Sequence, residues 1–134
     1  TVEHKRRRDV ELRFETNVDN SFVIKTDTRR VEQVLINYLT NAIKYTQKGS
    51  ITLGCDYDRD KKTVTFSVTD TGQGIPLEKQ KEIFERFSKL DNFHQGTGLG
   101  LNICNLIAEK LGGTVGVDST YTGGARFLFT LNVE

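Results

Sequence analysis

The stretch NYLTNAIKYT at residues 37–46 is the first of four short blocks that carry most of the information in this chain. DTGQGIP follows at residues 70–76, IFERF at 83–87 and GTGLGL at 96–101. Each additional block in the same order makes a chance occurrence less credible, because all four have to match at once. The blocks are therefore interpreted together.

Length, composition and charge predict a single domain that does not bind nucleic acid. The chain has 134 residues, 36% of them hydrophobic, which is enough for one buried core. Lys and Arg total 19 against 18 for Asp and Glu, so the basic excess of a nucleic-acid-binding protein is missing. The basic run at residues 5–8 precedes Asp9 and Glu11 and is interpreted as the solvated end of a connecting helix.

The sequence favours a soluble domain in a reducing compartment. No segment approaches the roughly eighteen consecutive apolar residues of a membrane span, and the N-terminus lacks the apolar centre of a signal peptide. Cys55 and Cys104 have no partners at metal-ligand spacing. We therefore expect buried, reduced thiols, a cytoplasmic location and no contact with the membrane.

Alternating apolar and polar residues predict the strands. The alternation occurs at residues 10–14, 22–24, 51–57, 63–70, 115–117 and 127–131. The first two segments are expected to open the domain as short strands. Residues 58–62 would close a hairpin between the next two, and Gly123-Gly124 would provide the last turn.

Apolar residues at helical spacing predict the helices. One helix runs through Val31 and Ile43, with Asp27 or Thr28 as its cap and Gly49 as its end. A short helix is expected from Pro76 to about residue 84, and residues 87–98 are expected to form a mobile loop. A further helical stripe consists of Leu99, Ile103, Leu106, Ile107 and Leu111, and it ends at Gly112-Gly113.

These elements predict an α+β fold. Strands and helices alternate without a strict βαβ rhythm, and there are no internal repeats. The expected architecture is a two-layer sandwich, in which a mixed, largely antiparallel sheet packs under about three helices.

The first predicted helix carries a polar stripe of Asn37, Asn41, Lys44 and Lys48. With about 100° of rotation per residue, the stripe lies about 130° from the centre of the apolar face and borders the core. An amide oxygen suits Mg²⁺, and a lysine one turn later suits phosphate oxygens. Taken alone, the stripe is better explained as the polar edge of an ordinary amphipathic helix.

Asp70 lies in phase with the inward-facing Val64, Phe66 and Val68. A buried carboxylate is unfavourable unless it is paired, and the exocyclic amine of adenine would supply a donor, whereas O6 of guanine would repel it. The alternative is that Asp70 caps the bend at Thr71-Gly72 as an Asx-type turn residue.

Two groups of glycines add a phosphate-binding pattern. Gly72 and Gly74 can adopt backbone angles closed to other residues and leave room for a base against the chain. Gly96, Gly98 and Gly100 precede and open a helix, whose free N–H groups favour a phosphate. No lysine of a P-loop follows, and no strand leads directly into the motif, which separates it from P-loop and dinucleotide folds.

Together the blocks resemble the N, G1, F and G2 boxes of the catalytic ATP-binding domain of sensor histidine kinases, a branch of the GHKL ATPase superfamily. The resemblance runs from about residue 10 to the end of the chain. It implies ATP and Mg²⁺ as cofactors, with Asn41 as the metal ligand, Lys44 as a phosphate contact and Tyr45 beside the nucleotide. Asn37 stands where hydrolytic relatives carry a glutamate base. Because an amide cannot accept a proton from water, the chain is expected to bind ATP without hydrolysing it efficiently.

The resemblance also extends to the F box and to the lid that follows it. Phe84 and Phe87 resemble the F box and would equally serve as core aromatics. Residues 88–95 would be the ATP lid, with Lys89 as a phosphate contact and His94 as incidental. The nucleotide-binding set implied by the resemblance is Asn37, Asn41, Lys44, Tyr45, Asp70, Gly72, Gly74, Ile75, Lys89, Gly96, Thr97, Gly98, Leu99, Gly100 and Leu101, of which Asn41 and Lys44 are the catalytic pair.

The phosphoryl acceptor is expected on another domain. The family's acceptor histidine is followed by an acidic residue and a proline, whereas His4 is followed by the basic run 5–8. Residues 1–9 would thus end a linker from a dimerisation hairpin, and residues 10–134 would form the catalytic domain. The implied partners are that hairpin and a response-regulator receiver domain. Two alternatives are an anti-sigma-type serine kinase and a non-catalytic ATP-binding module.

Overall fold

The computed structural model describes residues 10–18, 24–80, 82–84 and 100–133. A five-stranded sheet has the order β1-β2-β3-β5-β4. The strands are β1 (Val10–Thr16), β2 (Gly49–Asp58), β3 (Thr63–Asp70), β4 (Thr114–Val117) and β5 (Ala125–Asn132). The pair β1 and β2 is parallel and the other pairs are antiparallel, so the predicted mixed, largely antiparallel sheet is confirmed.

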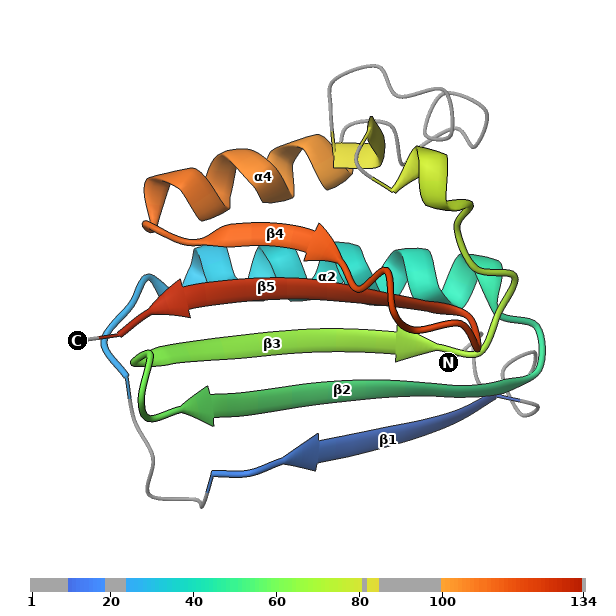
Figure 1. Cartoon of the computed structure of the whole chain (residues 1–134), viewed down its shortest axis with the longest axis horizontal. Helices are drawn as coiled ribbons and strands as arrows, with labels where there is room; N and C mark the ends of the chain where they lie inside the picture. Colours follow the sequence, from blue (N-terminus) through green and yellow to red (C-terminus); the bar gives the residue numbers. More distant parts are fainter. Residues whose placement is uncertain (1–9, 19–23, 81, 85–99, 134) are drawn as a thin grey trace.

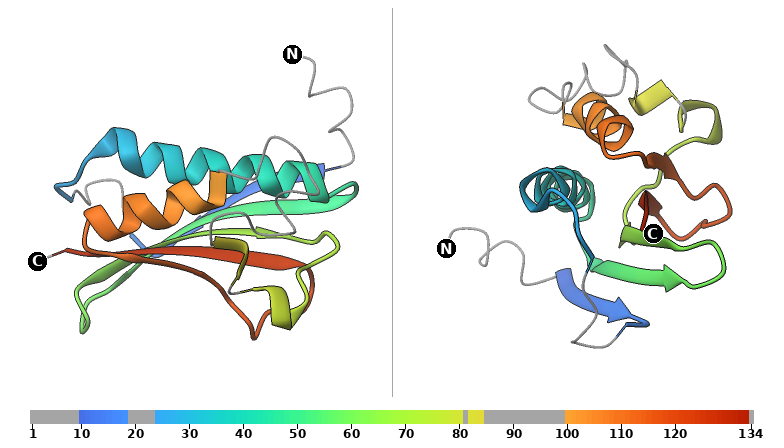
Figure 2. Two further views of the ribbon diagram at one scale, coloured as in Figure 1. Left: turned by 90° about the horizontal axis from the view of Figure 1, so that it is seen from above. Right: turned by 90° about the vertical axis from the view of Figure 1, so that its left-hand side faces the viewer.

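Helices α2 (Thr28–Tyr45) and α4 (Gly100–Lys110) lie side by side on one face of the sheet. Figure 1 and Figure 2 show the resulting two layers. Helix α2 packs on β3 and β5, while α4 packs on α2, β4 and β5. The α+β sandwich predicted from the sequence is therefore confirmed.

Helix α2 begins and ends where local chemistry requires. Asp27 is the N-cap, and its side chain accepts a hydrogen bond from the backbone N–H of Arg30 at 3.3 Å, as predicted. The helix ends at Tyr45, because Thr46 has extended backbone angles. Lys48 therefore lies outside the helix, and its predicted place on the polar stripe is wrong.

Three other predictions of secondary structure need correction. Ile24 is not in a strand, and the rest of the predicted segment 22–24 lies outside the described residues. The predicted helix from Pro76 is replaced by two 3-10 turns, η1 (Leu77–Lys79) and η2 (Glu82–Phe84). On α4, Leu106 is 52% exposed, and Cys104 and Ala108 join Ile107 on the buried face instead.

The core between the layers contains an aromatic cluster of Tyr38, Phe84 and Phe127. The rings of Tyr38 and Phe127 stack with centroids 5.1 Å apart, and Phe84 meets both edge-on. The fully buried hydroxyl of Tyr38 donates a hydrogen bond to the carbonyl of Leu128 at 2.8 Å. This bond ties α2 to β5, because a buried hydroxyl requires a partner.

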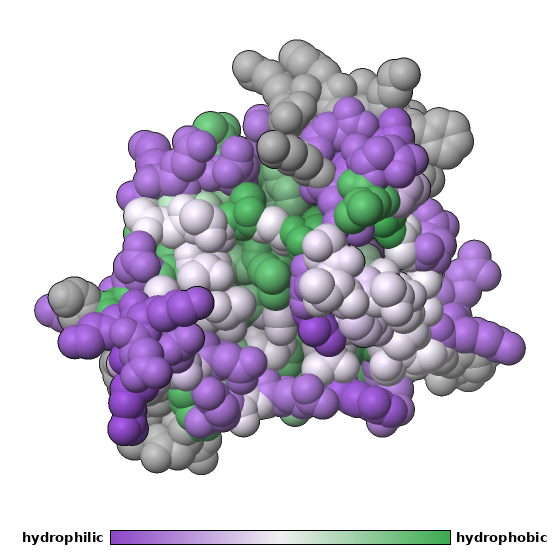
Figure 3. All heavy atoms as spheres, in the orientation of Figure 1, coloured by the Kyte–Doolittle hydropathy of each residue, from purple (hydrophilic) through white to green (hydrophobic). Residues whose placement is uncertain are grey.

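Figure 3 shows apolar side chains gathered near the middle of one face, below α4, with polar side chains around them. A groove beside β4 is lined there by Leu77, Gln80, Phe84, Asn105, Val115, Gly116 and Val117.

No helix of the described residues is both long and apolar enough to span a membrane.

Candidate functional site

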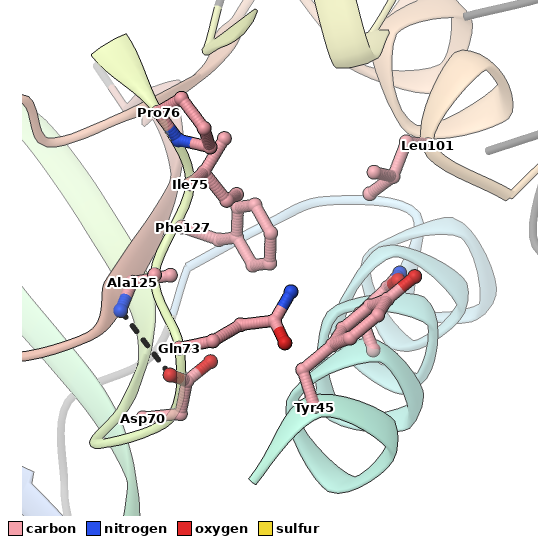
Figure 4. A pocket seen from close by; sticks show the side chains of 10 residues that line it. Tyr45, Asp70, Gln73, Ile75, Pro76, Leu101, Ala125 and Phe127 are labelled. Carbon is pink, nitrogen blue, oxygen red and sulfur yellow. Dashed lines mark hydrogen bonds between the residues drawn. The ribbon is translucent and has the colours of Figure 1, made fainter. Parts of the chain in front are cut away.

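A second hollow lies where the C-terminal half of α2, the turn after β3 and the start of α4 meet. It encloses about 460 Å³, including the open solvent at its mouth. Its lining is Asn41, Tyr45, Asp70, Gln73, Gly74, Ile75, Pro76, Leu101, Ala125 and Phe127. Figure 4 shows polar side chains on one side and apolar ones on the other.

Asp70 is the buried acid of this pocket, with 3% of its surface exposed. Asp70 is the last residue of β3 and pairs with Ala125 of β5. Its side chain points inward because alternate residues of a strand face the same side of the sheet. Its Oδ1 accepts the N–H of Gly72 at 2.9 Å and the N–H of Ala125 at 3.2 Å. None of the described residues donates to Oδ2. The bond to Gly72 is the Asx-type turn expected as an alternative, so Asp70 shapes the turn and still offers one oxygen to a ligand.

The pKa of Asp70 is raised from its ordinary value. Burial is the main cause, because it disfavours the charged carboxylate. The two backbone N–H donors partly oppose this rise. A ligand that donates to Oδ2 would stabilise the charged form further.

The glycines of the turn pack closely against neighbouring backbone. A side chain at Gly72 would collide with the backbone carbonyl of Tyr45. Gly74 has a φ of +78°, and a Cβ there would lie 3.0 Å from the carbonyl oxygen of Gly124. Both glycines thus permit close backbone packing around the pocket. The positive φ of Gly74 confirms that this position needs backbone angles closed to other residues, and the room for a base beside the two glycines stays a prediction.

Asn41 is buried on α2, with 4% of its surface exposed, and lines the pocket. Its Nδ2 donates to the backbone carbonyl of Asn37 at 3.1 Å. Because a carbonyl requires a donor, this bond fixes the amide and leaves Oδ1 as the atom available to a ligand. Tyr45 forms the wall one turn later, and Lys44 is exposed beside it.

Asn37 lies outside the pocket lining, one turn before Asn41. Its Nδ2 lies 3.6 Å from Sγ of Cys104 and donates to it, which connects α2 to α4. Burial raises the pKa of the Cys104 thiol to about 11. The thiol therefore stays protonated near neutral pH, in line with the buried thiol predicted from the sequence.

The structure brings together many of the predicted residues: Asn41, Tyr45, Asp70, Gly74, Ile75 and Leu101 line one pocket. The sequence reasoning missed Gln73, Pro76, Ala125 and Phe127. Gln73 and Pro76 stand inside the quoted block 70–76, so their position was a usable signal. Ala125 contributes a backbone N–H, which carries no signature in the sequence.

Several predicted residues cannot be placed. Lys89, Gly96, Thr97, Gly98 and Leu99 lie outside the described residues, as do Phe87, His94 and the predicted linker 1–9. Gly100 is the first residue of α4. Phe84 is buried against Tyr38 and Phe127, which confirms its interpretation as a core aromatic.

Comparison with known proteins places the chain among kinase sequences. A family described as histidine kinase-, DNA gyrase B-, and HSP90-like ATPase matches residues 26–134. The adaptive-response sensory kinase SasA of Trichormus variabilis is 43% identical over 112 residues, which are 82% of this chain and 28% of SasA. The autoinducer 2 sensor kinase/phosphatase LuxQ of Vibrio harveyi is 37% identical in an alignment of 133 positions, which covers 93% of this chain and 16% of LuxQ. The chain thus spans less than a third of the length of these relatives.

The solved structures that resemble this chain are also histidine kinases. The nucleotide-free catalytic domain of the histidine kinase ThkA superposes with a TM-score of 0.83 at 34% identity, over 98% of this chain and 84% of that one. Full-length ShkA in complex with AMPPNP gives 0.82 at 32% identity, over 98% of this chain and 28% of that one. The chain therefore belongs to the histidine kinase-, DNA gyrase B-, and HSP90-like ATPase family, and within it to the catalytic domains of histidine kinases.

Proposed function

We propose that this domain binds Mg·ATP and donates the γ-phosphoryl group to a histidine on a dimerisation hairpin of the same protein. A response-regulator receiver domain would then take the group on an aspartate. The observation that carries the proposal is the carboxylate of Asp70, which is buried in a pocket with one oxygen paired within the protein, while no described residue donates to the other.

The pocket fits an adenine base. Oδ2 of Asp70 can accept a hydrogen bond from the exocyclic amine of adenine, whereas O6 of guanine in the same place would meet a second acceptor. Apolar surface for the faces of the base comes from Ile75, Leu101 and Phe127. Burial excludes water around the carboxylate, which strengthens a hydrogen bond formed there.

The residues toward α2 fit a magnesium ion and phosphates. Oδ1 of Asn41 is the hard oxygen ligand that Mg²⁺ prefers, and the bond to the Asn37 carbonyl holds it in place. Lys44 lies almost one turn further along α2, where its ammonium group can contact phosphate oxygens. Bound ATP would supply the phosphoryl group, and the Mg²⁺ ion would neutralise part of the charge on the phosphates. Lys89 and residues 96–101 are assigned to the triphosphate from the sequence resemblance.

The same residues favour transfer over hydrolysis. Asn37 stands where hydrolytic relatives are expected to carry a carboxylate base, and an amide cannot accept a proton from water.

We propose that residues 10–134 act as a catalytic domain in the cytoplasm, joined through residues 1–9 to the hairpin, and that this domain itself binds neither nucleic acid nor membrane.

Calorimetric titration with Mg·ATP tests the binding step. Asp70→Asn should weaken binding about 100-fold, while Asp56→Asn, the same change at an exposed position of β2, should leave it unchanged. Unaltered affinity in the Asp70 variant would contradict the proposal.

Phosphoryl transfer is tested by mixing the domain and Mg·ATP with a separately made hairpin of the same protein. Acid-labile phosphohistidine should form on the hairpin with the wild-type domain and not with Asn41→Ala. Tight ATP binding without any transfer would instead favour the non-catalytic module.

A further inference from the structure

Asp70 alone does not distinguish adenine from guanine in every position of the base. Its open oxygen can accept the exocyclic amine of adenine, but a carboxylate can also accept the N1–H and the exocyclic amine of a guanine shifted within the pocket. Selection of adenine therefore requires a second group that holds the base in one position. The following inference rests on the proposed binding of ATP.

The side chain of Gln73 lies in the right place for this role. Figure 4 shows it pointing into the pocket between the carboxylate of Asp70 and the ring of Tyr45. Gln73 lines the pocket, and no other described residue hydrogen-bonds its amide. The amide is therefore available to a ligand that already contacts Asp70.

The backbone on either side of Gln73 is fixed. Gly72 packs against the carbonyl of Tyr45, and its N–H is bound by Oδ1 of Asp70. Gly74 has a positive φ and packs against Gly124. Because neither neighbour can move without breaking these contacts, the side chain of Gln73 starts from a rigid position, as a specific hydrogen bond requires.

We propose that Gln73 is a specificity-determining residue that donates its amide N–H to N1 of adenine, next to the exocyclic amine bound by Asp70. Adenine presents a donor and an acceptor side by side on this edge, and the pair Asp70 and Gln73 presents the complementary acceptor and donor. Guanine presents the reverse order, O6 and N1–H, so its O6 would face the carboxylate of Asp70, and Gln73 could pair with its N1–H only by turning its carbonyl oxygen toward the base.

The test compares ATP with 1-deaza-ATP, in which a C–H group replaces N1. The wild-type chain should bind 1-deaza-ATP about ten-fold more weakly than ATP, the size expected for one lost hydrogen bond. Gln73→Leu, of similar volume but without an amide, should bind both nucleotides with equal affinity, at the level of wild type with the analogue. Gln33→Leu on the exposed face of α2 is the matched control and should keep the wild-type ratio.

The outcomes separate this inference from the proposed function. If the wild-type chain and Gln73→Leu discriminate between the two nucleotides equally, the role of Gln73 is overturned while ATP binding stands. If the wild-type chain binds neither nucleotide, the proposed function fails as well. Gln73→Met provides a second amide-free variant, unbranched like glutamine, and it should also lose the discrimination. Retention of the wild-type ratio there would contradict the inference.

Discussion

Two parts of the interface between helices and sheet differ in how completely their buried polar groups are hydrogen-bonded. Around Tyr38, Phe84 and Phe127 the packing is closed, and the hydroxyl of Tyr38 has its partner in the carbonyl of Leu128. Around Asp70 the packing is open, and only Oδ1 of the carboxylate is paired with described residues. Phe127 belongs to both parts, since it stacks on Tyr38 and lines the pocket.

The difference separates stability from binding. A buried polar group with all its partners inside the protein holds the fold together, whereas a half-paired one is retained at the expense of stability and indicates a ligand. Variants in the closed part should therefore change the free energy of unfolding, and variants in the open part should change nucleotide affinity.

The largest effect is expected from Phe84→Ala in the closed part. Removing this buried ring from its contacts with Tyr38 and Phe127 should lower the free energy of unfolding by about 3–5 kcal/mol. Urea denaturation measures the change, and Phe84→Leu should lose less because it refills part of the space. An unfolding free energy equal to that of wild type would show that the cluster does not hold the fold.

Asp70→Asn is the matching change in the open part. It should weaken ATP binding about 100-fold, because a charge-assisted acceptor becomes an amide that can present a donor to the base amine. The free energy of unfolding should not fall, since the amide oxygen can still accept from Gly72 and Ala125. Calorimetry and urea denaturation on the same preparation check both statements. Loss of stability together with affinity would remove the distinction between the two parts.

A smaller change is expected from Tyr38→Phe. It leaves the carbonyl of Leu128 without its donor inside the core and should destabilise the domain by about 1–2 kcal/mol. The ATP affinity of the folded protein should stay at the wild-type value. A changed affinity would mean that the closed part also shapes the pocket.

Asn41→Ala should affect the dependence of binding on magnesium. The wild-type domain should bind ATP about ten-fold more tightly with Mg²⁺ than in the presence of a chelator, and the variant should lose this difference. Asn105→Ala on α4, away from the pocket, is the control. A magnesium effect of wild-type size in Asn41→Ala would exclude this residue as the ligand.

The smallest effect concerns pH. Because burial raises the pKa of Asp70, the native state holds its proton more tightly than the unfolded chain. Its contribution to stability therefore falls as pH rises from the ordinary pKa of 3.8 through the raised value, and is constant above it. Relative to wild type, Asp70→Asn should thus gain stability across this window, as measured by denaturation at several pH values. A difference that does not change with pH would contradict the raised pKa.

Much of the fold could be predicted because the relevant signals are local. Period-two alternation identified the hairpin of β2 and β3, and helical spacing with Asp27 as cap identified α2. The phase of β3 also predicted correctly that Asp70 faces inward. Local signals failed where the chain departs from regular periods, as at the two 3-10 turns after Pro76 and at the exposed Leu106.

The pocket could be predicted only in part, because some of its contacts join residues that are distant in the sequence. Ala125 donates its backbone N–H to Asp70 from 55 positions away, and a backbone group has no signature in the sequence. Phe127 alternates like any strand residue, so only the packing shows that it lines the pocket. The direction of the Gln73 side chain depends on two glycine contacts that exist only in the folded chain.

The central claim is that Oδ2 of Asp70 accepts the exocyclic amine of ATP. It is tested most directly by titrating wild type and Asp70→Asn with ATP and with purine riboside triphosphate, which lacks that amine. Wild type should bind ATP about 100-fold more tightly than the analogue, and Asp70→Asn should bind the two about equally. Equal affinity of wild type for both nucleotides, or a preference for ATP that survives in Asp70→Asn, would contradict the account.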